Sequence, residues 1–216
     1  KHQLEGNLEV VRFLGCDVSE NLPGLAADPA AERDVAAFLG ERPRPIVGIH
    51  PGASKKNKLW EAGKWARLAD RMTGDLQATV VILQGPSAEE SRMAETIRRL
   101  AVSGDRCVPY SGTVSHLVSV IRRLDLLVAL DSFSSHVAAA VGTPFVALFG
   151  PQHPDLARPY HYNGRVVFAE GVACRPCGTR CIHGDDNRCM KEISLDSVWR
   201  HVPGILRRRG SKGTAP

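Results

Sequence analysis

The sequence predicts an α/β fold with a Rossmann-like, doubly wound parallel sheet, and three observations support this. Short apolar runs of strand length alternate with segments of helical spacing along residues 46–202. Those runs are almost continuously apolar, which is typical of strands buried on both faces of a parallel sheet. Turns that contain glycine, hydroxyl or charged residues follow the runs, as at the ligand-binding edge of such sheets.

The clearest unit lies between residues 126 and 151. A predicted strand at 126–130 ends at Asp131, a short alanine-rich helix at 135–141 stops at Gly142, and a second strand follows at 145–149. The unit delivers a carboxylate and several serine hydroxyls to a helix N-terminus, where phosphate-bearing ligands bind in open α/β sheets. A plain helix cap is the alternative reading of Asp131.

The remaining helices and strands are predicted from N-cap residues and from the spacing of apolar residues. Asp28 can cap a helix with Pro29 in its first turn, and Trp65, Leu68 and Met72 share one face of another helix. A closing helix has Ser194 as its cap. The other predicted strands are 46–49, 78–83, 107–109 (an edge strand) and 165–169, and the predicted helices are 8–14, 29–39, 61–72, 87–100, 113–123 and 194–208.

These elements divide the chain into three parts. Residues 1–45 are predicted to be a connection of linker helices, with a Pro/Gly-containing linker at 21–29. Residues 46–202 are predicted to form a Rossmann-like, ligand-binding domain with a Cys-rich loop at 171–190, and residues 203–216 a basic C-terminal tail. The polar opening without Met suggests a fragment of a longer protein, and no secretory signal is recognisable.

Composition narrows the classes of function. With 216 residues, 43% of them hydrophobic, the chain can bury a substantial core, and its apolar runs are too short to span a bilayer. The net charge of +5 and a pI near 9 suit a partner with negative charge, such as a nucleotide, a nucleic acid or an anionic membrane surface. Part of the excess is local, with Lys55, Lys56 and Lys58 in one loop.

That loop follows the first predicted strand and reads HPGAS at 50–54 and KKNKLW at 55–60. Small residues permit close backbone approach and lysine supplies charge, so the loop is a candidate diphosphate cradle, although neither a Walker A nor a G-x-G-x-x-G motif is present. Further turns follow the next strands, at 84–86 and 110–114. Glu89 and Glu90 begin the helix that follows the first of these turns. A glutamate there can accept hydrogen bonds from ribose hydroxyls, or it can simply favour a helix N-terminus.

Four of the six cysteines, Cys174, Cys177, Cys181 and Cys189, form a C-x2-C-x3-C-x7-C pattern. Such a pattern can bind a structural zinc ion in a reducing compartment, form two disulfides in a secreted protein, or hold free thiols that pack a loop.

The motifs resemble glycosyltransferase family 9, the ADP-heptose:lipopolysaccharide heptosyltransferases. The resemblance rests on HPGAS…K-x-W at 50–60, Gly-Pro at 85–86 and D-S-x-S-x-H-x-A-A-A-x-G-T-P-x-x-x-L-F-G-P at 131–151. It implies the C-terminal, donor-binding half of a two-domain GT-B enzyme. The partner domain would bind the lipid acceptor and supply the catalytic aspartate.

The resemblance also implies roles for individual residues. Lys58 would stabilise the diphosphate leaving group, Glu89 would bind ribose, Val114 would line the adenine pocket and Asp131 would hold sugar hydroxyls. The residues expected to contact the diphosphate are Ala53, Ser54, Ser132, Phe133, Ser134 and His136. The family commonly has glycine at the position of Phe133, where phenylalanine would not easily take a positive φ. Many members carry a C-x-P-C…C…C-M segment like that at 174–190.

The leading hypothesis is therefore the donor-binding part of an inverting glycosyltransferase, without a required cofactor, that uses an ADP-sugar and a lipopolysaccharide acceptor. It would be cytoplasmic, with peripheral contact to the inner membrane, and inactive as this isolated chain. A non-catalytic binding module is the alternative, favoured by Phe133 and the serines around it. A zinc-ribbon nucleic-acid binder is disfavoured, because basic and aromatic residues do not interleave along a strand platform.

Overall fold

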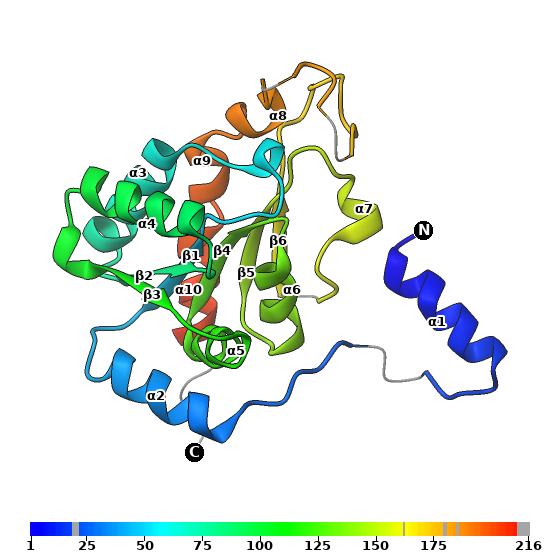
Figure 1. Ribbon diagram of the computed structural model, residues 1–216, viewed down its shortest axis with the longest axis horizontal. Coiled ribbons are helices and arrows are strands. Elements are labelled where there is room, and N and C mark those ends of the chain that lie inside the picture. The colour runs from blue at the N-terminus through cyan, green and yellow to red at the C-terminus, as the bar shows by residue number, and fades with distance from the viewer. Residues whose placement is uncertain (19–21, 162, 179–180, 185, 211–216) are drawn as a thin grey trace.

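A six-stranded parallel sheet with the order β3-β2-β1-β4-β5-β6 forms the centre of the protein (Figure 1). The computed structural model describes residues 1–18, 22–161, 163–178, 181–184 and 186–210. The strands are β1 (Ile46–His50), β2 (Thr79–Gln84), β3 (Cys107–Ser111), β4 (Leu126–Leu130), β5 (Phe145–Leu148) and β6 (Gly164–Val167). The predicted doubly wound fold is confirmed.

Helices cover both faces of the sheet and bury two apolar layers (Figure 1). One layer lies under α3 (Ala62–Asp75), α4 (Ala88–Leu100), α8 (Arg188–Lys191), α9 (Leu195–Trp199) and α10 (Val202–Gly210). The other lies under α2 (Pro29–Leu39), α5 (Val114–Arg123) and α6 (Phe133–Ala140). The central strands β1 and β4 are buried along their whole length, which explains their continuous apolar sequence.

Side-chain caps set the starts of four helices, and two of them, Asp28 and Ser194, were expected from the sequence. The side chains of Asp28, Ser87, Thr113 and Ser194 each accept a hydrogen bond from a backbone N–H in the first turn of the helix that follows. These interactions fix where the turns after the strands end and the helices begin. The turns are therefore held in place by local chemistry at the edge of the sheet.

The predicted closing helix 194–208 is wrong in one respect, because the structure divides it into α9 and α10. Pro203 explains the break. In a continuous helix its ring would clash with the carbonyl of Trp199, four residues earlier. Ile205 and Leu206 of α10 pack against the core, so this part of the predicted tail belongs to the domain.

The structure also has elements that the sequence pattern did not indicate. These are α7 (Pro154–Ala157), α8 and two short 3₁₀ helices, η1 (Lys56–Lys58) and η2 (Gly104–Arg106). Helix α6 starts at Phe133, two residues before the predicted position. None of the helices in the described parts of the chain is long and apolar enough to cross a bilayer.

Helix α1 (Gln3–Phe13) lies outside the two layers, beyond α7 (Figure 1). Its N-terminal end is attached to the segment after α7. His2 Nε2 lies 2.8 Å from the carbonyl oxygen of Arg158, and the hydroxyl of Tyr160 donates to Glu5 at 2.5 Å. The predicted helix 8–14 is thus the second half of a longer helix whose first turn contacts the domain.

Candidate functional site

The sheet reverses its direction of winding between β1 and β4, and the main candidate site lies at this point. The chain leaves β1 towards α3 on one face and leaves β4 towards α6 on the other. Ligands in open α/β sheets bind outside the carboxyl ends of the strands at such a switch point. The loops that carry Lys58 and Asp131 follow these two strands.

Lys58 and Asp131 form an ion pair at this edge. Lys58 Nζ lies 2.6 Å from Asp131 Oδ2 and 3.3 Å from the Asp131 carbonyl oxygen. Their side chains are only 14% and 8% exposed. Asp131 directly precedes Ser132, the N-cap of α6, so the ammonium group lies close to a helix N-terminus. The structure thus brings a lysine, a carboxylate and helix amides to one place.

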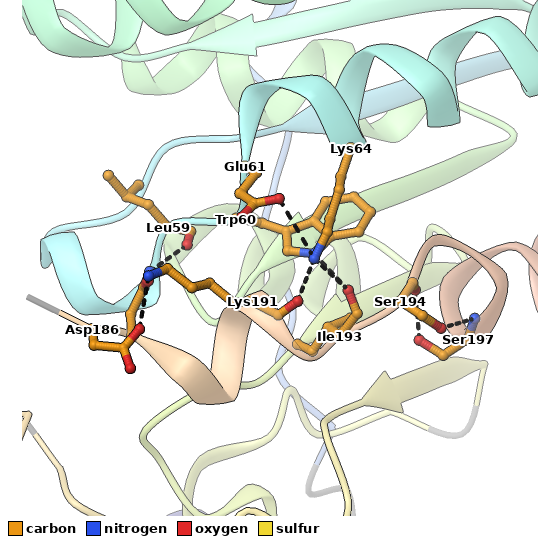
Figure 2. A network of polar contacts seen from close by, with 10 residues as sticks. Leu59, Trp60, Glu61, Lys64, Asp186, Lys191, Ile193, Ser194 and Ser197 are labelled. Carbon is orange, nitrogen blue, oxygen red and sulfur yellow. Dashed lines mark hydrogen bonds and ion pairs between the residues drawn. The ribbon is translucent and has the colours of Figure 1, made fainter. Parts of the chain in front are cut away.

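The loop that carries Lys58 is fixed to the segment 187–193 from the other end of the chain (Figure 2). The buried Trp60 donates from Nε1 to the carbonyl of Ile193 at 3.0 Å, and the side-chain amide of Asn187 donates to the carbonyl of Leu59 at 2.9 Å. Lys64 donates to the carbonyls of Lys191 and Ile193. These contacts hold the backbone on the C-terminal side of Lys58.

His50 occupies the end of β1, beneath this site. Its Nδ1 lies 2.7 Å from the hydroxyl of Ser134 and 3.5 Å from that of Ser132, and the two hydroxyls are 3.1 Å apart. Burial lowers the pKa of His50, and the nearby charge of Glu90 opposes this shift. At neutral pH the imidazole is therefore neutral and positions the first turn of α6 through its serine contacts.

Glu90, rather than the predicted Glu89, reaches the edge of the sheet. Its carboxylate accepts a hydrogen bond from the backbone N–H of Gly85, and Oε2 lies 3.9 Å from His50 Nε2. A Cβ at Gly52 would lie 2.6 Å from its Cδ, so the carboxylate sits between the turns after β1 and β2. Glu89 is exposed.

The helix phase explains this correction. Ser87 is the N-cap, and Glu90 follows it by three residues, the spacing of a capping box. At that position a glutamate points back over the helix N-terminus, whereas its predecessor points away. The S-x-x-E pattern was the signal that could have identified Glu90. His50 was likewise overlooked, although a histidine at the end of a buried strand is a recognisable feature.

The other predicted residues lie at the same edge with different exposure. Ala53 is partly buried, and Ser54 is exposed beyond it. Val114 is the first residue of α5, and its side chain is exposed. Phe133 is the first residue of α6 and 55% exposed. Its backbone is helical, and Gln77 is the non-glycine residue with a positive φ among those described, so the expected strain at Phe133 is absent.

His136 follows Phe133 by three residues on α6 and is exposed. Partial desolvation lowers the pKa of His136, which the charge of Asp131 opposes, while His2 and Lys58 lower it further. The charges of the ion pair and of the N-terminal end of α1 thus both act on His136.

The four clustered cysteines are not arranged as a zinc site in the described part of the chain, which was one of the three readings of their spacing. Among the residues that the structure describes, no three cysteine, histidine, aspartate or glutamate side chains are arranged to hold a metal ion. Cys174, Cys177 and Cys181 are partly buried and Cys189 is buried, and burial raises the pKa of Cys189 to about 11. Arg175 anchors the loop instead through the carbonyls of Gly150, Ala169 and Gln152. Thiols that pack a loop fit the structure better than zinc ligands.

Comparisons with known proteins agree with this fold. The model of glycosyltransferase family 9 (heptosyltransferase) matches residues 1–183. A lipooligosaccharide heptosyltransferase 2 from Haemophilus influenzae is 33% identical over 163 residues, which cover 70% of this chain and 46% of that protein. The chain therefore spans about half the length of the curated relatives that it matches.

Two solved structures support the fold alone, because their sequence identity is low. ADP-heptose lps heptosyltransferase II from E. coli has a TM-score of 0.71 and 23% identity, and the match covers 88% of this chain and 57% of that one. An E. coli heptosyltransferase with ADP-2-deoxy-2-fluoro heptose has a TM-score of 0.60 and 17% identity, over 84% and 50% of the two chains.

Proposed function

This chain belongs to glycosyltransferase family 9, and from that premise we propose that it is the donor-binding part of a heptosyltransferase. The donor would be an ADP-linked heptose or a related sugar, and the acceptor the inner core of a lipopolysaccharide. The observation that carries the proposal is the Lys58–Asp131 pair at the switch point, beside the N-terminus of α6. The heptosyltransferase solved with ADP-2-deoxy-2-fluoro heptose favours ADP as the nucleotide.

In the proposed arrangement, the nucleoside lies over the turns after β1 and β2, where Glu90 can accept hydrogen bonds from ribose hydroxyls. The diphosphate lies at the N-terminus of α6, whose amides and dipole favour negative charge. Lys58 exchanges its partner, because a dianionic diphosphate attracts the ammonium more strongly than one carboxylate does. Asp131 is then free to hold sugar hydroxyls.

The proposed reaction is a direct displacement at the anomeric carbon. The acceptor hydroxyl forms the new glycosidic bond, and the bond from the anomeric carbon to the diphosphate oxygen breaks with inversion. Negative charge develops on the leaving diphosphate, and Lys58 with the helix amides stabilises it. The base that accepts the hydroxyl proton is assigned to the partner domain, so this chain alone is expected to bind the donor without transferring the sugar. The acceptor would be presented at the cytoplasmic face of the inner membrane.

Calorimetric titration with ADP tests the proposal. Removing the Lys58 ammonium by Lys58→Met should weaken ADP binding by at least about tenfold, because a charge-assisted contact to phosphate is lost and Asp131 is left unpaired. Lys55→Met is the matched control, since Lys55 is an exposed lysine of the same loop. Equal ADP affinity in the two variants would remove Lys58 from the site. No binding of any nucleotide by the unaltered chain would favour the non-catalytic module.

A further inference from the structure

The side chain of Asn187 makes a contact that its position in the helix does not require. Asn187 is the N-cap of α8, where an asparagine side chain ordinarily accepts a hydrogen bond from a backbone N–H of the first turn. Its side chain makes no such bond to α8. The amide instead donates from Nδ2 to the carbonyl oxygen of Leu59 at 2.9 Å. Asn187 is therefore directed at the loop that carries Lys58.

Helix α8 is a firm support for this contact, because it is packed into the domain at the end of the Cys-rich loop. Cys189 and Met190 of α8 are buried. A Cβ at Gly150 would lie 2.7 Å from Met190 Cγ and 3.3 Å from Cys189 Sγ, so α8 packs directly against the backbone that follows β5. Arg175 donates to the carbonyl oxygen of the same glycine. The Cys-rich loop thus ends in a short, well-packed helix whose N-cap reaches the lysine loop.

Two further side chains join the lysine loop to the segment that contains α8 (Figure 2). Trp60 is buried and donates from Nε1 to the carbonyl oxygen of Ile193 at 3.0 Å. The ammonium of Lys64 donates to carbonyl oxygens at the C-terminal end of α8 and at Ile193. On its other side, the backbone N–H of Lys58 donates to the carbonyl of Lys55 within η1. The backbone around Lys58 is therefore held from both directions.

A fixed backbone matters for Lys58 because its side chain must serve two partners. In the structure its ammonium contacts Asp131, and in the proposed function it turns to the diphosphate. A lysine carries its charge on a flexible stem, so the backbone decides which positions the ammonium can reach. With the backbone already in place, the change of partner needs only a rotation of the side chain. No loop then has to be ordered when the anion binds, which favours affinity.

We propose that Asn187 is a positioning residue of the diphosphate site and that it acts on the ligand only through Lys58. The inference rests on the proposed function, because it requires the diphosphate to bind at Lys58. It also gives the Cys-rich loop a role in donor binding. The buried Cys189 and Met190 hold α8 in place, and α8 in turn holds the lysine loop through Asn187.

Calorimetric titration of Asn187→Asp with ADP and with adenosine tests this inference. Aspartate is a favourable N-cap residue, so α8 should remain intact, but its carboxylate cannot donate to the Leu59 carbonyl. ADP binding should weaken by about fivefold, whereas adenosine, which offers no phosphate to Lys58, should bind as it does to the unaltered chain. Asn163→Asp is the matched control and should leave ADP affinity unchanged. Asn163 Nδ2 also donates to a backbone carbonyl, that of Gly142 at 2.8 Å, before β5 and β6.

A double variant shows whether the effect passes through Lys58. Lys58→Met combined with Asn187→Asp should bind ADP as weakly as Lys58→Met alone, because Asn187 then has no ammonium to position. A further loss of ADP affinity in the double variant would overturn the inference. An equal loss for ADP and adenosine in Asn187→Asp would also overturn it, because a general disturbance of the fold would explain both.

The outcomes separate this inference from the proposed function. If ADP binding depends on Lys58 but Asn187→Asp binds ADP as tightly as Asn163→Asp does, the positioning role is overturned while the diphosphate site stands. If the unaltered chain does not bind ADP, the proposed function fails and the positioning role fails with it.

Discussion

Two ion pairs join the loops around β1 and β4 at opposite edges of the same sheet, and they have different surroundings. At the amino edge, Asp125 Oδ1 accepts from Arg44 at 2.7 Å, and Oδ2 accepts from the backbone N–H of Ile46 at 2.8 Å. At the carboxyl edge, Asp131 pairs with Lys58 at 2.6 Å. The Arg44 side chain is 57% exposed, whereas that of Lys58 is 14% exposed.

The difference lies in what each carboxylate satisfies. Asp125 holds a buried backbone donor at the start of β1, and that N–H would lose its partner if the carboxylate were removed. Asp131 holds a lysine on a loop, and in the proposed function the diphosphate takes over that lysine. An ion pair at the edge of a sheet therefore has a structural role where its carboxylate also accepts a hydrogen bond from a buried backbone N–H. It is available for ligand binding where each side chain can exchange its partner for a group of the ligand.

The largest expected effect tests the structural pair. Asp125→Ala should lower the free energy of unfolding by about 3 kcal/mol, because it leaves the Ile46 N–H buried without an acceptor and the Arg44 guanidinium without its partner. Chemical denaturation measures the change. ADP affinity should remain at its original value in the folded fraction.

Asp105→Ala provides the control, since Asp105 is exposed and its removal should change stability by no more than about 0.5 kcal/mol. A similar loss in both variants, or a loss of ADP affinity in Asp125→Ala, would contradict the division between the two edges.

The second-largest expected effect is a pH dependence of the unfolding free energy that arises from His50 at the carboxyl edge of the sheet. Burial lowers the pKa of His50 in the folded protein, so the unfolded chain binds more protons below the ordinary histidine pKa of about 6.5. This contribution to stability is present above pH 6.5 and is lost as the pH falls further. Glu90, which faces His50 from α4, opposes the shift, and the hydroxyls of Ser132 and Ser134 face it from α6.

Replacing the imidazole by His50→Asn should make the loss of stability between pH 7.5 and 5.5 smaller by about 1 kcal/mol. Unfolding free energies at several pH values measure it. His136 and His201, whose pKa values are also lowered, act in the same direction and remain in the variant. An unchanged pH profile would show that His50 is not held neutral at this edge.

Much of the sheet could be predicted because its strands are buried on both faces and its helices carry their own caps. The strand 126–130 and the helix 29–39 agree with the structure at both ends. The break before Pro203 could also have been read from the sequence, since proline excludes a continuous helix. By contrast, the position of α1 against Tyr160 depends on a contact between residues 155 positions apart, which no local pattern indicates.

The sequence allowed the residues of the candidate site to be identified, but it did not allow the contacts between them to be predicted. Lys58 and Asp131 each follow a buried strand, but their meeting depends on β1 and β4 being neighbours, which is a property of the topology. Which of Glu89 and Glu90 reaches the sheet edge depends on the exact residue at which α4 begins, because neighbouring helix positions point in different directions. The cysteine spacing was compatible with a metal site, but spacing alone does not decide whether at least three ligands converge, and in the described residues they do not.

The smallest expected effect concerns the exchangeable pair itself. Asp131→Asn keeps the shape of the side chain but removes its charge. The diphosphate then no longer competes with a carboxylate for Lys58 and is no longer repelled by that carboxylate. ADP should therefore bind about threefold more tightly. Asp125→Asn, which alters the corresponding carboxylate at the amino edge, should leave ADP affinity unchanged. Weaker ADP binding in Asp131→Asn would mean that Asp131 holds Lys58 in position for the anion, and the two pairs would then share a structural role.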